Sequence, residues 1–279
     1  YGATAALHYA KLHVENSPES KVLVIASDIA KYGVGTPGEP TQGAGSVAML
    51  ITQNPRIMAF NNDNVAQTRD IMDFWRPNYS STPYVNGMYS TQQYLDCLTT
   101  TWDEYKKRYD WTMDDFAAIC FHLPYPKLAL KGLRKMMDKT LSKEKQDSLQ
   151  ENFDKSILYS QMIGNIYTGS LFLGLLSLLE NAETLKAGDK IALYSYGSGA
   201  VSEFFSGELV EGYEAYLDKE RLSKLKQRTA LSVADYEKVF FEEVQLDESG
   251  SAQFAGYEHQ DYALVEILDH QRRYSKVEK

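Results

Sequence analysis

Residues 117–127, AAICFHLPYPK, decide how this chain folds. The first five residues form an uninterrupted apolar run of strand length, which indicates a strand buried in a core. Pro124 and Pro126 end that strand and stiffen the turn after it, because the proline ring fixes φ. The polar His122 stands where the strand stops. The stretch therefore predicts a buried strand, a rigid turn and a helix after the turn.

The same alternation of short apolar runs and helical patterns extends along the rest of the chain. Further buried strands are expected at 22–26, 45–51 and 191–195, and helices at 101–109, 127–139, 142–159 and 168–181. The aromatic and acidic stretch 239–244, VFFEEV, is interpreted as strand or sheet-edge material. Together these patterns predict an α/β fold in which helices cover the sheets.

Length, charge and cysteine content exclude several classes of protein. The 279 residues suffice for one large domain or two small ones, and the net charge of −9 argues against a nucleic-acid partner, which would need many Lys and Arg to neutralise phosphates. The longest apolar run, 168–179, is too short to span a bilayer, so no membrane partner is expected. Cys97 and Cys120 provide neither a disulfide framework nor a zinc ligand set, and a reducing cytoplasm is the expected location.

His122 is the strongest candidate for a chemical role. The C-terminal end of a strand is where α/β folds gather ligands, and a near-neutral pKa suits an imidazole to proton transfer or to polarising a carbonyl. A satisfied core histidine is an equally consistent interpretation. Cys120 lies two residues earlier on the same strand face, but Cβ atoms roughly 7 Å apart disfavour a direct nucleophilic pair. A free cysteine in an apolar strand is more often an inert hydrophobic residue.

The first residues of the chain predict an amphipathic helix. Its apolar positions share one face at helical spacing: Ala3, Leu7, Ala10 and Val14. His8 and His13 lie about 140° apart around such a helix, so they do not share a metal-binding face. Both are interpreted as surface or half-buried helix positions, and no metal site is expected.

A positive stripe follows His122 on the next expected helix. Lys127, Lys131, Arg134 and Lys135 are spaced i, i+4, i+7 and i+8, which places them on one helical face. A solvated helix face explains this spacing. A landing site for a polyanionic ligand, such as a nucleotide-tailed coenzyme, explains it equally well.

Two glycine-flanked motifs carry polar side chains that could meet a ligand. Asn165 follows a glycine in GNIYTGS (164–170), where it could cap a helix or offer its amide to a substrate oxygen. Ser198 lies in YSYGSGA (194–200), directly after an expected strand. Neither motif is a dinucleotide-binding G-x-G-x-x-G or a P-loop, so nucleotide binding of those kinds is disfavoured.

Six segments of the chain, taken in order, form a wider pattern than any single motif: ASDIAKYG, EPTQGAGSVAML, MDFWRP, FHLPYPK, GNIYTGS and SYGSGAVSEFF. Together they closely resemble the hydroxymethylglutaryl-CoA synthase family in its compact bacterial form. That family belongs to the thiolase-like condensing enzymes, so the resemblance implies a layered αβαβα fold built from two similar halves. On this basis residues 1–55 are expected to be the remainder of the N-terminal half, whose first part is missing from this chain. Residues 56–279 are expected to be the C-terminal half, with inserted helical and loop segments.

The resemblance also implies an acyltransferase reaction. Acetyl-CoA, acetoacetyl-CoA and water give 3-hydroxy-3-methylglutaryl-CoA (HMG-CoA) and free CoA, a step of the mevalonate route to isoprenoids. The expected partners are these CoA esters and a second copy of the chain in a homodimer, with no cofactor beyond the thioester substrates. In the family a cysteine thiolate is acetylated, a glutamate removes a proton from the acetyl methyl, and the enolate attacks the ketone.

Site residues follow from the resemblance position by position. His122 matches the histidine that positions acetoacetyl-CoA and polarises its ketone. Tyr32 matches a loop tyrosine beside the acyl-enzyme, and Asn165 and Ser198 match polar residues around the acyl group and thioester. Further positions match contacts to the CoA portion or its product: Thr41, Ser90, Lys127 and Lys131. Asp28 and Asp73 are expected to support the site, or to be structural carboxylates that only form hydrogen bonds.

Two departures from the family pattern stand out. Asn86 precedes Gly87 where the family more often has Asp, which affects local loop contacts. The family's nucleophilic cysteine directly precedes the Tyr-Gly-Ala-Thr stretch, so it is expected one position before Tyr1, where a helix N-terminus lowers the thiol pKa. The catalytic glutamate is likewise expected outside this chain. A ketoacyl-synthase type of condensing enzyme and an inactive CoA-ester-binding fragment are the alternatives.

Overall fold

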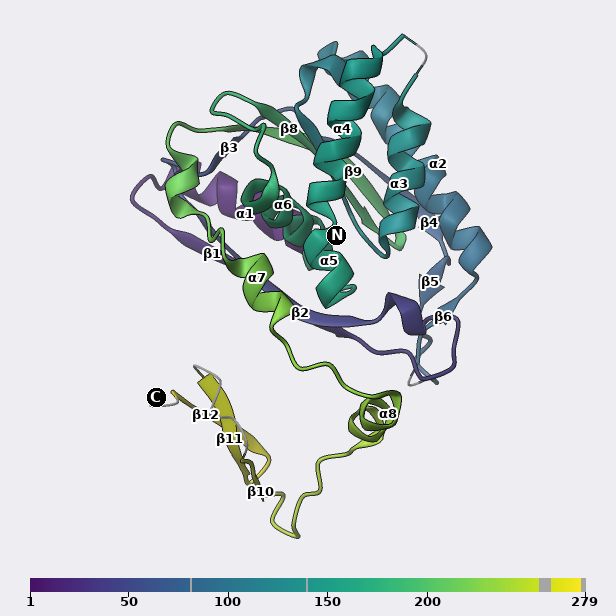
Figure 1. Ribbon diagram of the computed structural model, residues 1–279, viewed down its shortest axis with the longest axis vertical. Helices are drawn as coiled ribbons and strands as arrows, with labels where there is room; N and C mark the ends of the chain where they lie inside the picture. Colours follow the sequence, from purple (N-terminus) through teal and green to yellow (C-terminus); the bar gives the residue numbers. More distant parts are fainter. Residues whose placement is uncertain (81, 139, 256–261, 277–279) are drawn as a thin grey trace. The chain divides into compact units, whose positions relative to one another are not determined.

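The computed structural model describes residues 1–80, 82–138, 140–255 and 262–276, and it divides into two compact units (Figure 1). The larger unit is Tyr1–Arg228 and the smaller is Thr229–Lys279. Within the described ranges, no helix has both the length and the apolar character needed to cross a bilayer.

A five-stranded mixed sheet forms the centre of the larger unit. Its strands are β7 (Ala118–Phe121), β8 (Lys190–Gly197), β9 (Gly199–Leu209), β3 (Met58–Phe60) and β4 (Val65–Ile71). The parallel pair β7–β8 is followed by the antiparallel hairpin β8–β9, and β9 also pairs with β3 and β4. The strands predicted at 117–121 and 191–195 are confirmed as the two parallel neighbours.

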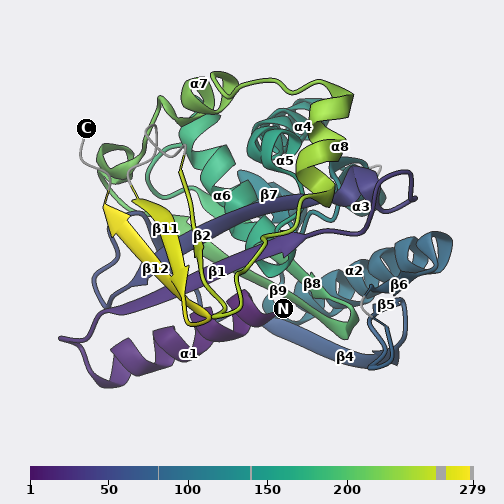
Figure 2. The ribbon, with the colours of Figure 1, turned by 90° about the horizontal axis from the view of Figure 1, so that it is seen from below.

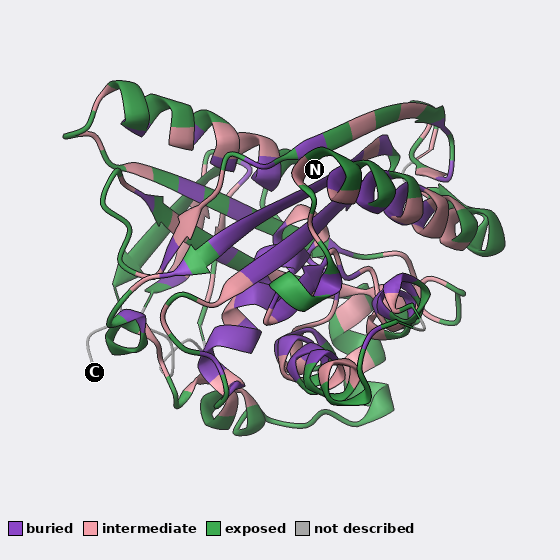
Figure 3. Ribbon diagram, turned by 90° about the horizontal axis from the view of Figure 1, so that it is seen from above, coloured by how far each residue is buried: buried purple, intermediate pink, exposed green. Residues whose placement is uncertain are grey.

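Alternate side chains of β7 and β8 enter two separate cores. Cys120 and Leu193 pack with α1 (Gly2–Asn16) and α6 (Ser170–Asn181), whereas Phe121 and Tyr194 pack with the helices on the opposite face. Those helices are α2 (Gly87–Tyr109), α3 (Pro126–Met136) and α4 (Lys143–Ser156). Figure 3 shows β8 and β9 buried along most of their length. This layering of helices and sheets confirms the α/β class.

A second, two-stranded ribbon covers α1 and α6 on their other side. It pairs β1 (Val22–Ala30) with β2 (Gly43–Ile51) in antiparallel register, and Figure 2 shows α1 running alongside it. The prediction that these strands are fully buried is wrong, because only one face of the ribbon is covered. The opposite face exposes Leu23, Ile25 and Ile29. Both faces carry apolar residues, so no period-two pattern revealed the difference.

Several predicted elements differ from the structure in extent or type. Helix α2 begins well before 101, and the helix expected at 142–159 ends at Ser156 and is followed by α5 (Leu158–Ile163). The helix expected at 127–139 ends at Met136, and residue 139 lies outside the described residues. The stretch 239–244 is not a strand: its first part ends α8 (Val233–Phe241). Ser232 caps this helix by accepting a hydrogen bond from the Asp235 backbone N–H at 3.1 Å, a signal that the aromatic residues obscured.

The remaining elements are short. In the larger unit they are η1 (Glu39–Thr41), β5 (Phe74–Trp75), β6 (Tyr84–Val85), η2 (Met113–Asp115), η3 (Tyr167–Gly169), η4 (Tyr213–Tyr216) and α7 (Arg221–Lys226). The smaller unit contains α8 and an antiparallel sheet of β10 (Ala252–Gln253), β11 (Tyr262–Leu268) and β12 (Gln271–Lys276). The predicted division of the chain at residue 55 into two thiolase-like halves stays a prediction.

Candidate active site

His122 is the first residue beyond β7. Its backbone N–H donates a hydrogen bond to the Tyr194 carbonyl at 2.7 Å, which extends the parallel pairing by one residue. Its own carbonyl accepts a hydrogen bond from the Tyr94 hydroxyl at 3.0 Å. Helix α3 then begins at Pro126, a residue type favoured in the first turn because its missing N–H is not needed there. The ring is therefore held at the C-terminal edge of the sheet, as the sequence predicted.

The surroundings of His122 favour a neutral imidazole. Burial among protein atoms lowers the pKa of His122 to about 3. Tyr1 lies against the β8–β9 turn, because a Cβ atom at Gly197 would be 2.8 Å from the Tyr1 backbone nitrogen. A neutral imidazole can donate a hydrogen bond from one ring nitrogen at pH 7, which suits it to polarise a carbonyl.

A buried carboxylate gathers three hydroxyl groups beside His122. Asp73 Oδ2 accepts hydrogen bonds from Tyr196 (2.9 Å), Ser198 (3.0 Å) and Ser90 (3.1 Å). The Asp73 side chain is fully buried, and its Oδ1 has no hydrogen-bond partner among the residues that the structure describes. The Tyr196 ring lies 6.4 Å from the His122 ring, between their centroids. Asp73 thus brings two predicted site residues, Ser90 and Ser198, to one carboxylate near His122.

Asn165 and Tyr32 form a second polar group. Asn165 Oδ1 accepts hydrogen bonds from the Tyr167 backbone N–H (2.9 Å) and the Ser170 hydroxyl (3.1 Å), while the side chain also hydrogen-bonds to Tyr32. Burial, followed by a hydrogen bond with Tyr167, raises the pKa of Tyr32 above its usual value. The phenol of Tyr32 is therefore a neutral donor rather than a base.

The position of Asn165 is set by the close approach of the backbone at Gly43 and Gly164. Gly43 in β2 forms an isolated bridge with Gly164, and the Asn165 N–H donates to the Gln42 carbonyl at 3.2 Å. Gly164 has φ = +86°, a conformation that costs glycine little, and a Cβ there would collide with the Gln42 carbonyl oxygen. This contact fastens the GNIYTGS segment to the β1–β2 ribbon.

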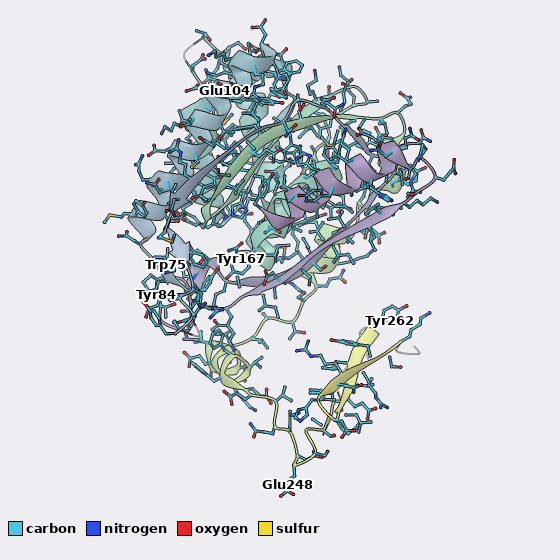
Figure 4. All side chains as sticks on the ribbon, turned by 180° about the vertical axis from the view of Figure 1, so that it is seen from behind. Trp75, Tyr84, Glu104, Tyr167, Glu248 and Tyr262 are labelled. Carbon is cyan, nitrogen blue, oxygen red and sulfur yellow. The ribbon has the colours of Figure 1, made fainter. Side chains whose placement is uncertain are left out.

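Phe74 links the two polar groups. Phe74 directly follows Asp73, and its ring lies 5.7 Å from Tyr32 and 6.4 Å from Tyr167, between ring centroids. Figure 4 shows Tyr167 on the side of the molecule where Trp75 and Tyr84 lie. Phe74 therefore connects the segment that carries Asp73 to the Tyr32 and Tyr167 rings beside Asn165.

The other predicted residues lie outside these contacts. Thr41 is in η1 and donates its hydroxyl to the Gly38 carbonyl at 2.8 Å. Lys127 and Lys131 are exposed on α3, whose opposite face is buried against α2 and the sheet. The predicted basic face is confirmed as a solvent-facing stripe, and its role in binding stays a prediction.

The two cysteines do not form part of the site. Burial raises the pKa of Cys120 to about 12, and burial also raises the pKa of Cys97. A thiol is nucleophilic only as the thiolate, so both are poor nucleophiles at neutral pH. In the part of the chain that the structure describes, no group of three or more His, Cys, Asp or Glu side chains is arranged to hold a metal ion.

Sequence reasoning missed several residues that organise the site. Tyr196 precedes Ser198 by two positions, so both point to the same side of the strand end, and that spacing could have identified it. The contact of His8 with Glu203, whose atoms Nε2 and Oε1 are 2.7 Å apart, had no signal in the sequence. The interpretation of His8 as an ordinary half-buried position overlooked this partner.

Comparison with known proteins places the chain in a family. The family "Hydroxymethylglutaryl-coenzyme A synthase C terminal" matches residues 64–151 and 133–274. The hydroxymethylglutaryl-CoA synthase of Enterococcus faecalis is 52% identical over 249 residues, covering 88% of this chain and 64% of that protein. The chain thus spans less than two thirds of the length of this curated relative.

Solved structures agree with the sequence matches. A crystal structure of HMG-CoA synthase complexed with CoA superimposes with a TM-score of 0.94 at 66% identity, covering 99% of this chain and 71% of that one. A structure of MvaS in complex with 3-hydroxy-3-methylglutaryl coenzyme A gives a TM-score of 0.79 at 30% identity, covering 100% of this chain and 72% of the other. The chain belongs to the hydroxymethylglutaryl-CoA synthase family.

Proposed function

We propose that this chain carries the acetoacetyl-CoA and CoA side of an active site that condenses acetyl-CoA with acetoacetyl-CoA and water. The products are HMG-CoA and free CoA. One observation carries the proposal: a neutral His122 stands at the sheet edge, beside the start of α1 and the Asp73 hydroxyl cluster. Relatives named hydroxymethylglutaryl-CoA synthase, and structures holding CoA or HMG-CoA, support the same reaction.

The chemistry assigns His122 to the ketone. When the enolate of an enzyme-bound acetyl group attacks the ketone carbon of acetoacetyl-CoA, negative charge develops on the ketone oxygen. A hydrogen bond from the neutral His122 ring stabilises that charge more than it stabilises the neutral ketone, and so lowers the barrier. The alkoxide takes up a proton, and water then hydrolyses the thioester that joins the condensed acyl group to the enzyme, which releases HMG-CoA and the free enzyme thiol.

The start of α1 is the proposed place of the acyl group. The N-terminal end of a helix carries partial positive charge, which lowers the pKa of a thiol located there. The expected cysteine before Tyr1 would occupy this end, where Tyr1 lies against the β8–β9 turn. Tyr32 and Asn165 then act as neutral hydrogen-bond donors around the acyl group.

The remaining positions are assigned to the CoA portion. The Lys127 and Lys131 ammonium groups would attract the phosphates of CoA from solvent, since both lie on the exposed face of α3. Ser90, Ser198 and Thr41 provide hydroxyl groups for the thioester and pantetheine. The CoA esters act as substrates, and the proposal requires no further cofactor.

The test uses the full-length protein with His122→Ala, and His13→Ala as control because His13 is exposed on the last turn of α1. We expect His122→Ala to lower HMG-CoA formation about 100-fold, within the range for one oxyanion donor, while acetylation of the enzyme falls less than about tenfold. Mass spectrometry of acetyl-enzyme and product separates the half-reactions. Equal loss in both would contradict the role of His122, and a wild type that binds CoA esters without turnover would identify an inactive binding protein.

We further propose that the protein works as a homodimer in the cytoplasm, in the mevalonate route. The family resemblance suggests the dimer and the route, and the two free buried thiols, Cys97 and Cys120, are consistent with a reducing compartment. Analytical ultracentrifugation of the full-length protein tests the dimer: a monomer at micromolar concentration would overturn it.

A further inference from the structure

A fully buried carboxylate lies behind the first two turns of α1. Glu203, in β9, is directly paired in register with Ser195 of β8, and its side chain has no exposure to solvent. The Tyr1 hydroxyl donates a hydrogen bond to Glu203 Oε2 at 2.5 Å, and His8 Nε2 lies 2.7 Å from Oε1. A buried carboxylate is costly unless it has polar partners; here Tyr1 donates to one oxygen and the His8 ring lies against the other.

The contacts to Glu203 belong to a longer seam between α1 and the hairpin. Tyr1, Thr4 and His8 follow one another at helical spacing on one face of α1. Thr4 donates its hydroxyl to the Ser195 hydroxyl at 2.8 Å, in a fully buried contact. Because Ser195 and Glu203 are directly opposite in the β8–β9 pairing, α1 is fixed at three points to two neighbouring strands.

The same hairpin carries part of the candidate site. Tyr196 and Ser198 follow Ser195 along β8 and into the turn, where both donate to Asp73. A Cβ at Gly197 would almost touch the Tyr1 nitrogen, so the start of α1 lies against this turn. A shift of α1 along the seam would therefore move Tyr1 relative to both His122 and Ser198.

We propose that Glu203 is a positioning residue. Its carboxylate lies against His8 and accepts a hydrogen bond from the Tyr1 hydroxyl, and through Tyr1 it holds the first turn of α1 against the site. It touches neither substrate nor reacting atoms and acts only through α1. This inference rests on the proposed function. It identifies α1 as the element that sets the distance between the proposed acyl group at its start and the side chains of His122 and Ser198. Misplacement of a reacting group by about 1 Å can cost on the order of 100-fold in rate, so small movements of α1 matter.

The decisive variant replaces the pair by apolar residues in the full-length protein. Replacing a buried carboxylate together with its partner by hydrophobic residues of similar size often leaves stability unchanged or raises it. We therefore expect the double variant Glu203→Met with His8→Leu to keep its melting temperature within a few degrees of wild type. Its kcat should fall at least tenfold, with the KM for acetoacetyl-CoA within about twofold.

Two further variants keep the inference falsifiable if the double variant does not fold. Tyr1→Phe removes a single hydroxyl, and we expect it to lower kcat about fivefold. Glu203→Gln keeps an oxygen acceptor for Tyr1, and we expect it to retain kcat within about threefold of wild type. Glu208→Gln is the matched control, because Glu208 is exposed on the same strand.

The outcomes separate this inference from the proposed function. A wild type that makes no HMG-CoA defeats the proposed function and this inference with it. If the wild type is active, unchanged kcat in the double variant or in Tyr1→Phe overturns the positioning role alone. A loss of kcat that follows the loss of melting temperature would show that Glu203 only holds the fold.

Discussion

The two sides of the candidate site are built in opposite ways. Around Asp73 the carboxylate and the Tyr196 phenol are buried, Ser90 is half-buried and Ser198 is exposed, but each hydroxyl has a fixed partner in Asp73 Oδ2, 2.9–3.1 Å away. Along α3, in contrast, Lys127 and Lys131 project into solvent from a helix whose other face is buried. Hydroxyl groups that share a buried acceptor are oriented before substrate arrives, whereas exposed ammonium groups attract anions over a distance and are screened by salt. Under the proposed function we therefore expect the chemical step on the Asp73 side and substrate capture on the lysine side.

The largest effect is expected from Asp73→Ala. The change leaves the hydroxyls of Tyr196, Ser198 and Ser90 without their shared acceptor, so we expect kcat of the full-length protein to fall about 100-fold, comparable to the loss of an oriented hydrogen-bonding group. Steady-state kinetics with both CoA esters provides the measurement. Asp70→Ala, an exposed position on β4, is the control, and a kcat within threefold of wild type in Asp73→Ala would remove the distinction between the two sides.

The next effect tests how the Asn165 segment is fastened. Gly164→Ala adds a Cβ that collides with the Gln42 carbonyl, so we expect it to lower the free energy of unfolding by about 2–4 kcal/mol in urea denaturation. Gly188 has the nearly identical φ of +85° with open space around it, so Gly188→Ala measures backbone strain alone, about 1 kcal/mol. Equal losses at both glycines would show that the close approach to β2 contributes nothing.

A pH effect is expected from His122, next to the Asp73 hydroxyls. Because the folded-state pKa of His122 is about 3, below its ordinary 6.5, the unfolded chain binds a proton between these values while the folded chain does not. Stability attributable to His122 is therefore constant above pH 6.5 and falls as pH decreases toward 3. From pH 7 to 5 we expect wild type to lose about 1–2 kcal/mol more than His122→Asn, measured by urea denaturation at each pH. An equal decrease in the free energy of unfolding of wild type and His122→Asn would show that the pKa of His122 is not lowered in the folded protein.

The smallest effect is expected at the exposed lysines. Lys131→Ala should raise the KM for acetoacetyl-CoA about two- to fivefold at low salt and leave kcat unchanged, because it removes one exposed charge from the approach of the phosphates. The difference from wild type should shrink at 0.5 M KCl, where screening is strong. Lys107→Ala on the exposed part of α2 is the control. A fall in kcat without a rise in KM would show that Lys131 acts in the chemical step and not in substrate capture.

The sequence predicted the parts of the fold in which local pattern and burial agree. The apolar runs in β7 and β8 and the rigid turn after His122 were correctly located because nothing polar interrupts them. Strand β9 was missed because Ser202, Glu203 and Ser206 interrupt its apolar run, and each is buried by a partner that is distant in sequence. Such partners leave no local trace.

The candidate site divides in the same way. His122, Asn165 and Ser198 could be selected from their positions after a strand or a glycine, and the family resemblance added Tyr32, Thr41, Ser90, Lys127 and Lys131. The role of Asp73 as a common acceptor could not be predicted, because its three donors come from two other elements, α2 and the end of β8. Only folding brings these groups to one carboxylate.

Strands β7 and β8 contribute side chains to a separate core on each face of the sheet, which affects the cooperativity of unfolding. A one-residue slip of β7 against β8 would send Phe121 toward α1 and α6 and Cys120 toward α2 and α3, and a slip of β8 would do the same to Tyr194 and Leu193. Both cores therefore oppose the same error. Since His122 and Ser198 directly follow these two strands, the β7–β8 register sets the spacing between them, and packing on both faces of the sheet stabilises that register. Local unfolding of one core cannot relax that spacing unless the other core opens with it.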